Sequence, residues 1–340
     1  MEATLINNCG GGQKRIKWLD ILKGISMFMI ILAHSGAPEE YTWLYNPFFL
    51  SAFFFVSGYT FRPMQNAKEF VIHKLKGQVY PFAVFGFINA VMAVLVEHDS
   101  WIDRLQFLIS RNRIWDDMWF IACLVSSEFV FYLLFRITEK YFKGKNTKLI
   151  ALLIMSLVIS YAGILYIRNV QVKLPWQFEH ACSNVVFVTL GYLMKQKRDK
   201  FIVEDKLRWW VIISIVYVAS VLVFPNHVAI HAGEYDNWAL YLLDAILGIA
   251  SLILFSQVIE QYFENNLMTR FVVFVGANTL VYYAFQSKVI KAVEILLTRI
   301  GMLPISQYAA SLIVAMITAI ILIIPAYFIR KRMPFLLKVK

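Results

Sequence analysis

The sequence is poor in charged residues and in cysteine. Only 16% of its 340 residues are charged, against about 25% in an ordinary soluble domain, which excludes a disordered chain, a coiled coil and a conventional soluble globule. Its three cysteines are odd in number and scattered, so they provide neither a disulfide framework nor metal-ligand spacing. The chain is instead 59% hydrophobic, with a mean hydropathy of +0.61.

Long apolar runs take up most of the chain, and each has about the 20 residues that a helix needs to cross a bilayer. The alternating ten-residue pattern of an outer-membrane barrel does not describe them. We expect ten spans, with edges good to a few residues, at 18–36, 44–61, 78–96, 118–135, 149–167, 178–194, 209–224, 238–256, 271–297 and 307–329. The sequence thus predicts an all-α integral membrane protein of about ten transmembrane helices.

Lysine and arginine are distributed unevenly across this topology. With the N-terminus inside, the inner segments hold 24 of the 33 lysine and arginine residues, the outer loops hold 6, and the spans hold the other 3. This bias predicts that both termini are cytoplasmic, with a flexible tail at 1–17, one membrane domain at 18–330 and a basic tail at 331–340. The net charge of +11 then faces anionic lipid, and we expect no nucleic-acid partner. For the outer segment at 97–117 we predict a short amphipathic helix that lies at the outer interface.

Ionisable residues inside the first span mark a candidate site, because each costs at least about 2.5–3.5 kcal/mol in a bilayer. Lys23 and His34 are 11 residues apart, which puts them on one stripe of a helix, about 16 Å apart along its axis. Asp20 lies close to the same stripe, near the cytoplasmic face. The alternatives are an ordinary i,i+3 pair of Asp20 with Lys23 and, for His34, a histidine at an interfacial helix end.

Basic residues also follow the second span. Arg62, His73, Lys74 and Lys76 would attract a cytoplasmic polyphosphate, although the positive-inside bias explains any one of them equally well. In the fourth span, Glu128 is a lone carboxylate, which must be protonated or paired. A structural pair with a lysine is the alternative to a catalytic role.

Outer residues of several spans form a further polar set. Its members, besides His34, are Glu179 and His180 in the sixth span and Gln286, Lys288 and Lys291 in the ninth. Trp119 of the fourth span lies at the outer interface. A tryptophan is also expected at the outer interface for ordinary reasons. His227 and His231 have ligand-like i,i+4 spacing, but they lie in a loop with no obvious third ligand, so we predict no metal site.

Charge at the inner end and histidine at the outer end of an aqueous path suggest a two-sided active site. The inner basic groups would hold an anionic donor, and His34 would act as general base on a hydroxyl from outside, since the pKa of histidine lies near operating pH. Intramembrane charges serve transport equally well. A secondary transporter or flippase, or a ligand-sensing module for a small polar molecule, therefore stays open.

Four segments, in this order, resemble the acyltransferase-3 family of polytopic membrane O-acyltransferases over nearly the whole chain. Lys23, ten residues and His34 are similar to the family's first-span pattern of a basic residue, ten residues and histidine. FFFVSGYTFR resembles its FF-x-x-SG motif. DMWFIACL and VTLGYLMK resemble its Trp-Phe-Leu and Leu-Gly-Tyr segments. In place of the commoner arginine the chain has Lys23, as in the branch resembling fucose O-acetylases.

This chain departs from the family's motifs at two further places, one in the segment expected to bind the donor and one in the segment expected to bind the acceptor. His73-Lys74-x-Lys76 stands where the family has Arg-x-x-Arg, and Gln286 stands where a histidine often follows a Tyr-Leu pair. The resemblance implies that His34 is the catalytic histidine, as a general base or a transient acyl carrier. It implies acyl-CoA, usually acetyl-CoA, as donor substrate, with no permanently bound cofactor.

The resemblance also implies transfer to a hydroxyl of an extracytoplasmic or lipid-linked glycan, in the inner membrane of a bacterium. We assign Asp20 and Glu128 to the catalytic group together with Lys23 and His34. The donor would contact Lys23, Arg62, His73, Lys74 and Lys76. The acceptor would contact Trp119, Glu179, His180, Gln286 and Lys288. Membrane lipid is a further expected partner, and a homodimer is left open.

Overall fold

The computed structural model describes residues 15–64, 66–96, 100–102, 118–197, 203–303 and 306–337. Most of the predicted tail at 1–17 and of the predicted helix at 97–117 lies outside these residues, as does the end of the basic tail. The described chain is almost entirely helical, which confirms the all-α prediction. A small antiparallel hairpin pairs β1 (Val228–Ala229) with β2 (Glu234–Tyr235).

The described helices follow in chain order. They are α1 (Lys17–His34), α2 (Glu39–Thr42), α3 (Ser51–Thr60), α4 (Ala67–Lys74), the π-helical turn η1 (Leu75–Val79), α5 (Tyr80–Val96), α7 (Trp119–Tyr141), α8 (Lys145–Asn169), the 3-10 turn η3 (Pro175–Gln177), α9 (Phe178–Gln196), α10 (Lys206–Val223), α11 (Trp238–Tyr262), α12 (Leu267–Ala277), α13 (Thr279–Arg299), α14 (Gln307–Ile321), α15 (Ile323–Arg332) and the 3-10 turn η5 (Pro334–Leu336).

Six of the described helices are long and apolar enough to cross a membrane, or up to seven if a bent pair counts as one span. The predicted number of ten is therefore not confirmed. The stretch expected as one span at 271–297 is instead α12 and α13, which meet at a bend of 94°. At the break the Asn278 side chain donates to Phe274 O (2.7 Å), and so satisfies a carbonyl that the interrupted helix leaves open.

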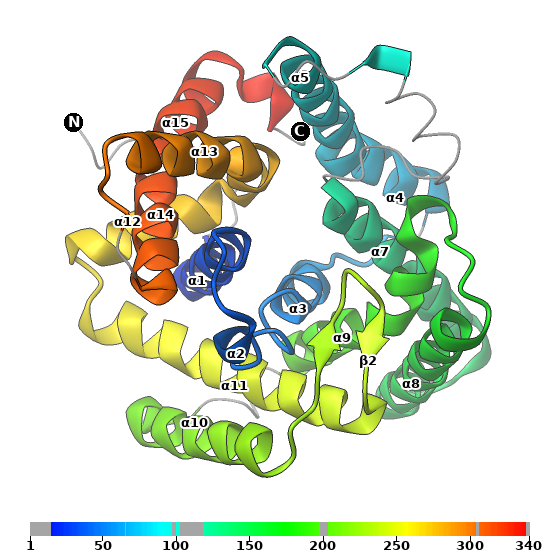
Figure 1. The fold of residues 1–340 in the computed structure, drawn as a ribbon. Helices are drawn as coiled ribbons and strands as arrows, with labels where there is room; N and C mark the ends of the chain where they lie inside the picture. Colours follow the sequence, from blue (N-terminus) through cyan, green and yellow to red (C-terminus); the bar gives the residue numbers. More distant parts are fainter. Residues whose placement is uncertain are drawn as a thin grey trace.

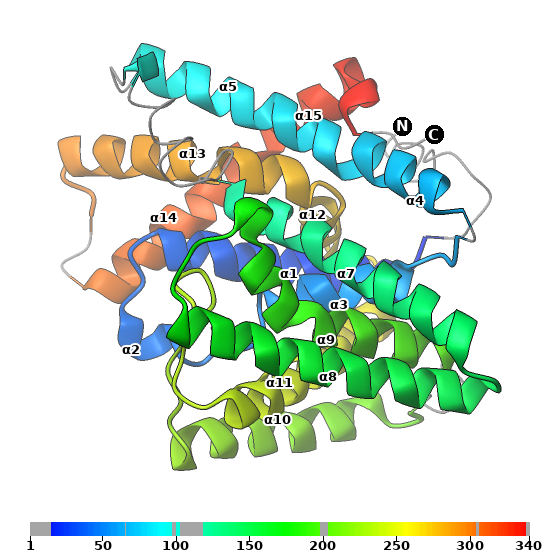
Figure 2. The same cartoon turned by 90° about the vertical axis from the view of Figure 1, so that its right-hand side faces the viewer.

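Helix α1 lies inside the bundle, where it packs against α3, α11, α12, α13 and α14 (Figure 1). Its contact with α12 is close, since a Cβ added at Gly24 would collide with the carbonyl oxygen of Val272. Gly58 allows the same approach of α3 to Val188 on α9. Figure 2 shows α4 and α5 on one side of the bundle and α10 on the other.

Candidate active site

Near the N-terminal end of α1 lies an ion-pair cluster around Asp20. This buried carboxylate lies 2.9 Å from Lys23 Nζ and also pairs with Arg15. The i,i+3 pair considered as an alternative is thus present. Two cations pair with Asp20, so its carboxylate orients Lys23 in the N-terminal half of α1. Its role in catalysis stays a prediction.

His34 is the last residue of α1, and its side chain is exposed. The His34 ring lies within electrostatic range of His231, which the hairpin carries between β1 and β2. The sequence pattern marks His231 only as a candidate metal ligand and gives no sign that the fold brings it near His34. Among the described residues, no group of three or more His, Cys, Asp or Glu is arranged to hold a metal ion.

Three of the five residues predicted to bind the acceptor come together beneath this hairpin. Glu179 and His180 are buried at the start of α9, with His180 Nε2 3.6 Å from Glu179 Oε1. The Trp119 ring, at the start of α7, lies 6.2 Å from the His180 ring between centroids. A Cβ added at Gly233 would lie 3.1 Å from His180 Cε1, so the hairpin rests directly on this group.

The hairpin is held in place by buried and main-chain contacts. The Tyr235 hydroxyl is buried 3.5 Å from Ser183 Oγ on α9, and burial raises the pKa of Tyr235, so this hydroxyl stays protonated at neutral pH. Arg168, near the end of α8, donates to the carbonyl oxygens of Tyr235 and Asp236. These contacts fix the position of His231.

The other two residues predicted to bind the acceptor lie on α13. Gln286 is buried and Lys288 is half-buried. Helix α13 packs against α1, and its Tyr283 hydroxyl accepts from Phe120 N, one residue from Trp119 (3.3 Å). The helix therefore lies between the His34 helix and the Trp119 helix. Direct participation of Gln286 and Lys288 in a site stays a prediction.

Glu128 forms the centre of a buried network toward the opposite end of the bundle. Its carboxylate lies 2.7 Å from Lys74 Nζ, and it accepts from Gln78 Nε2 (3.3 Å) and Ser57 Oγ. The pair with a lysine is thus present, and the side chains of Lys74 and Glu128 are only 12% and 5% exposed. Gln78 lies in the π-helical turn η1, a geometry common at functional sites.

The remaining predicted donor cations are exposed. Arg62 follows α3, His73 lies on α4 and Lys76 on η1. Arg62 is within electrostatic range of His73 and of Lys195, whose Nζ donates to Phe61 O (2.6 Å). Lys195 was missed, because it had been counted only toward the positive-inside bias. The signal that pointed to it was its position at the end of the VTLGYLMK segment.

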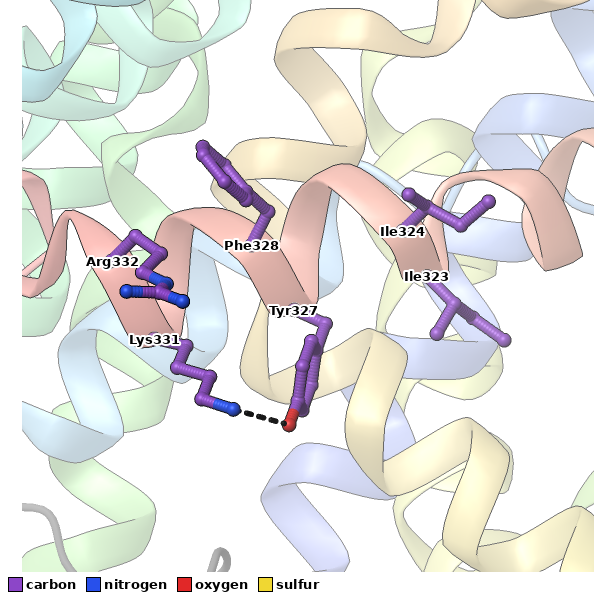
Figure 3. Close-up of a pocket in the computed structure, with 6 residues that line it drawn as sticks. All are labelled: Ile323, Ile324, Tyr327, Phe328, Lys331 and Arg332. Atoms are coloured by element: carbon purple, nitrogen blue, oxygen red, sulfur yellow. Dashed lines mark hydrogen bonds between the residues drawn. The ribbon is translucent and has the colours of Figure 1, made fainter.

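A surface pocket lies elsewhere, on one face of α15 (Figure 3). Lys331 and Tyr327 interact there, with Nζ 3.5 Å from the hydroxyl. The pocket is lined by Ile323, Ile324, Tyr327, Phe328, Lys331 and Arg332. None of these residues belongs to the predicted site, so the pocket is separate from it.

The fold and these clusters define a multi-pass helical membrane protein with ionisable groups inside its bundle. The acyltransferase-3 family model, described as an acyltransferase domain, matches residues 16–324. The match covers most of the chain and every predicted site residue, so the protein belongs to this family and is a membrane acyltransferase. The particular branch of the family is not confirmed. Comparison with curated proteins and with solved structures found no match.

Proposed function

We propose that the protein is an O-acyltransferase. It moves an acyl group, an acetyl group in the simplest case, from cytoplasmic acyl-CoA to a hydroxyl of an extracytoplasmic or lipid-linked glycan. One observation carries the proposal: in a chain of this family, the central helix α1 has Lys23 toward one end and an exposed His34 at the other. The resemblance to the fucose O-acetylase branch supports the choice of an acetyl group and a glycan.

His34 removes the proton of the acceptor hydroxyl as its oxygen attacks the thioester carbonyl. The carbon–sulfur bond then breaks, an ester forms, and the proton ends on the thiol of coenzyme A. In the two-step version, the imidazole first takes the acyl group and then passes it to the hydroxyl. Trp119 offers an apolar ring beside the polar groups of Glu179 and His180, a combination that suits a hydroxylated ring substrate.

In this proposal both termini are cytoplasmic, in a bacterial inner membrane. Cations at the inner end hold the phosphates of the donor through charge-assisted hydrogen bonds. The acceptor approaches from the side of the hairpin and α2.

The test is acyl transfer by the purified protein in detergent, where no gradient exists. We expect thiol release from acetyl-CoA and an acetyl mass increase on the acceptor glycan. His34→Ala should abolish both while the protein still inserts and elutes as a folded monomer or dimer. Normal activity of that variant would refute the mechanism. Counterflow in liposomes without an acyl product would favour a transporter, and saturable ligand binding without turnover would favour a sensing module.

A further inference from the structure

The pocket on α15 lies on a face of that helix which the bundle leaves open. Ala326 and Ile329 are buried against the rest of the protein, whereas Tyr327 and Phe328 are 42% and 56% exposed. The pocket has a volume of about 440 Å³. Leu336, in the turn η5 that follows, is buried and anchors the end of the helix. The pocket is therefore fixed on the surface by the fold.

The chemistry of the pocket changes from one end to the other. Its lining consists of two rows of residues four apart, and residues at this spacing are neighbours on a helix surface. The rows are Ile323, Tyr327 and Lys331, and Ile324, Phe328 and Arg332 (Figure 3). Each row runs from an isoleucine through an aromatic ring to a cation. With a rise of 1.5 Å per residue, the cations lie about 12 Å along the axis from the isoleucines.

The two cations at the basic end are open to a ligand. The Lys331 ammonium lies 3.5 Å from the Tyr327 hydroxyl and 5.5 Å from the centre of its ring, which holds it at the pocket. Within the part of the chain that the structure describes, no carboxylate pairs with Lys331 or Arg332. A guanidinium beside an ammonium suits a phosphate group, which accepts charge-assisted hydrogen bonds from both.

The position of α15 in the bundle supplies the apolar part of the argument. Gln307–Arg332 is one of the six candidate membrane spans, so the basic end of the pocket is also the end of a membrane-spanning segment. The isoleucines and Phe328 then lie at the depth of lipid chains, and the cations lie where the headgroups begin. A soluble phosphate ester would use only the basic half of the pocket.

We propose that this pocket binds an anionic phospholipid. The headgroup phosphate bonds to Lys331 and Arg332, and an acyl chain runs along Ile323, Ile324 and Phe328. Basic pockets at the cytoplasmic ends of transmembrane helices recognise anionic headgroups, and the predicted topology places this end of α15 in the cytoplasm. The inference goes beyond the proposed acyl transfer and does not depend on it.

The test uses the purified full-length protein in detergent. It is titrated with phosphatidylglycerol or with phosphatidylcholine of the same acyl chains, and native mass spectrometry counts the bound lipids. Wild type should bind its first phosphatidylglycerol at least about fivefold more tightly, the factor that one cation near a headgroup contributes. The double variant Lys331→Met/Arg332→Met should lose this preference and keep its affinity for phosphatidylcholine. Phe328→Ala should weaken the binding of both lipids.

Lys140→Met/Lys143→Met is the matched control, because it removes two charges from another helix end. Lys140 also lies over a tyrosine ring, 4.9 Å from the centre of Tyr141 in the last turn of α7. All four lysine and arginine positions are exposed, so each double variant should elute as folded protein. The control should keep the preference for phosphatidylglycerol.

Four results would overturn the inference. They are equal affinity of wild type for the two lipids, an equal loss of preference in both double variants, unchanged lipid binding by Phe328→Ala, and displacement of phosphatidylglycerol by glycerol 3-phosphate. The last compound has a phosphate but no acyl chain, so its success would mean that the site takes soluble phosphate esters.

Discussion

At the scale of single residues, the most informative pairing is His34 with His231. Because His34 lies within electrostatic range of His231, positive charge at His231 disfavours protonation of His34. Removing His231 should therefore let His34 protonate more readily. In the His231→Gln variant, the acid limb of the pH–rate profile should move to higher pH, which initial rates across a pH series would show.

His227→Gln is the matched control for this prediction. His227 lies in the same outer loop, but its Nε2 is 3.3 Å from Glu234 Oε2 and both side chains are exposed. This variant should keep the wild-type profile. If both variants shift the profile equally, the effect comes from the hairpin as a whole and the pairing with His34 plays no part.

The Lys74–Glu128 pair makes a second prediction at this scale. Glu128→Gln leaves a nearly buried lysine without its carboxylate partner, which should cost about 3–5 kcal/mol of stability. Lys74→Met in the same chain should recover part of the loss, because the unpaired charge is then gone. Thermal unfolding in detergent of wild type, the two single variants Glu128→Gln and Lys74→Met, and the double variant measures this double-mutant cycle.

The exposed pair of Lys148 and Glu139, with its atoms 2.6 Å apart, is the reference for that cycle. Breaking a surface pair should cost only about 0–1 kcal/mol. If the double variant of Lys74 and Glu128 is no more stable than Glu128→Gln, the pair is not the source of the loss.

The sequence predicts candidate site residues, but it indicates little of how the fold groups them. Lys23 and Asp20 lie on one helix, so their pairing follows from helical spacing. The partners of Glu128 come from α3, α4 and η1, and contacts between segments 50 or more residues apart leave no periodic signal.

At the scale of whole elements, the tight crossing of α1 and α12 makes a clear prediction. Gly24→Val puts a branched side chain where even a Cβ collides with the Val272 carbonyl. Two helix backbones must then separate, and the His34 helix shifts with them. We expect loss of folded protein in size-exclusion chromatography. Ala292→Val, on an exposed position of α13, should have little effect, and a similar loss there would contradict the packing argument.

Hydropathy located nearly every helix but misjudged where two of them end. The first half of the run at 271–297 is almost entirely apolar, so its hydropathy does not reveal the 94° bend. Only Asn278, a residue that favours helix ends, indicates it. Similarly, α3 has only 10 residues within a stretch expected to span the membrane. In both cases packing against α1 and α9 determines the geometry, and such tertiary contacts are absent from a single-chain hydropathy pattern.

At the scale of the whole molecule, Lys23 and His34 lie about 16 Å apart along α1. In the proposed function these two ends of the helix serve the donor and the acceptor. Since coenzyme A is too polar to cross a bilayer, transfer by the proposed route should depend on which face of the membrane the donor meets.

Sealed vesicles of defined orientation test this arrangement. With acetyl-CoA added outside, vesicles whose cytoplasmic face points outward should release thiol, and right-side-out vesicles should not. Permeabilising the right-side-out vesicles with detergent should restore release to the same rate, which shows that their enzyme is intact. Equal release by both kinds of intact vesicle would mean that the donor site opens to the outer side, and the orientation derived from the lysine and arginine distribution would be wrong.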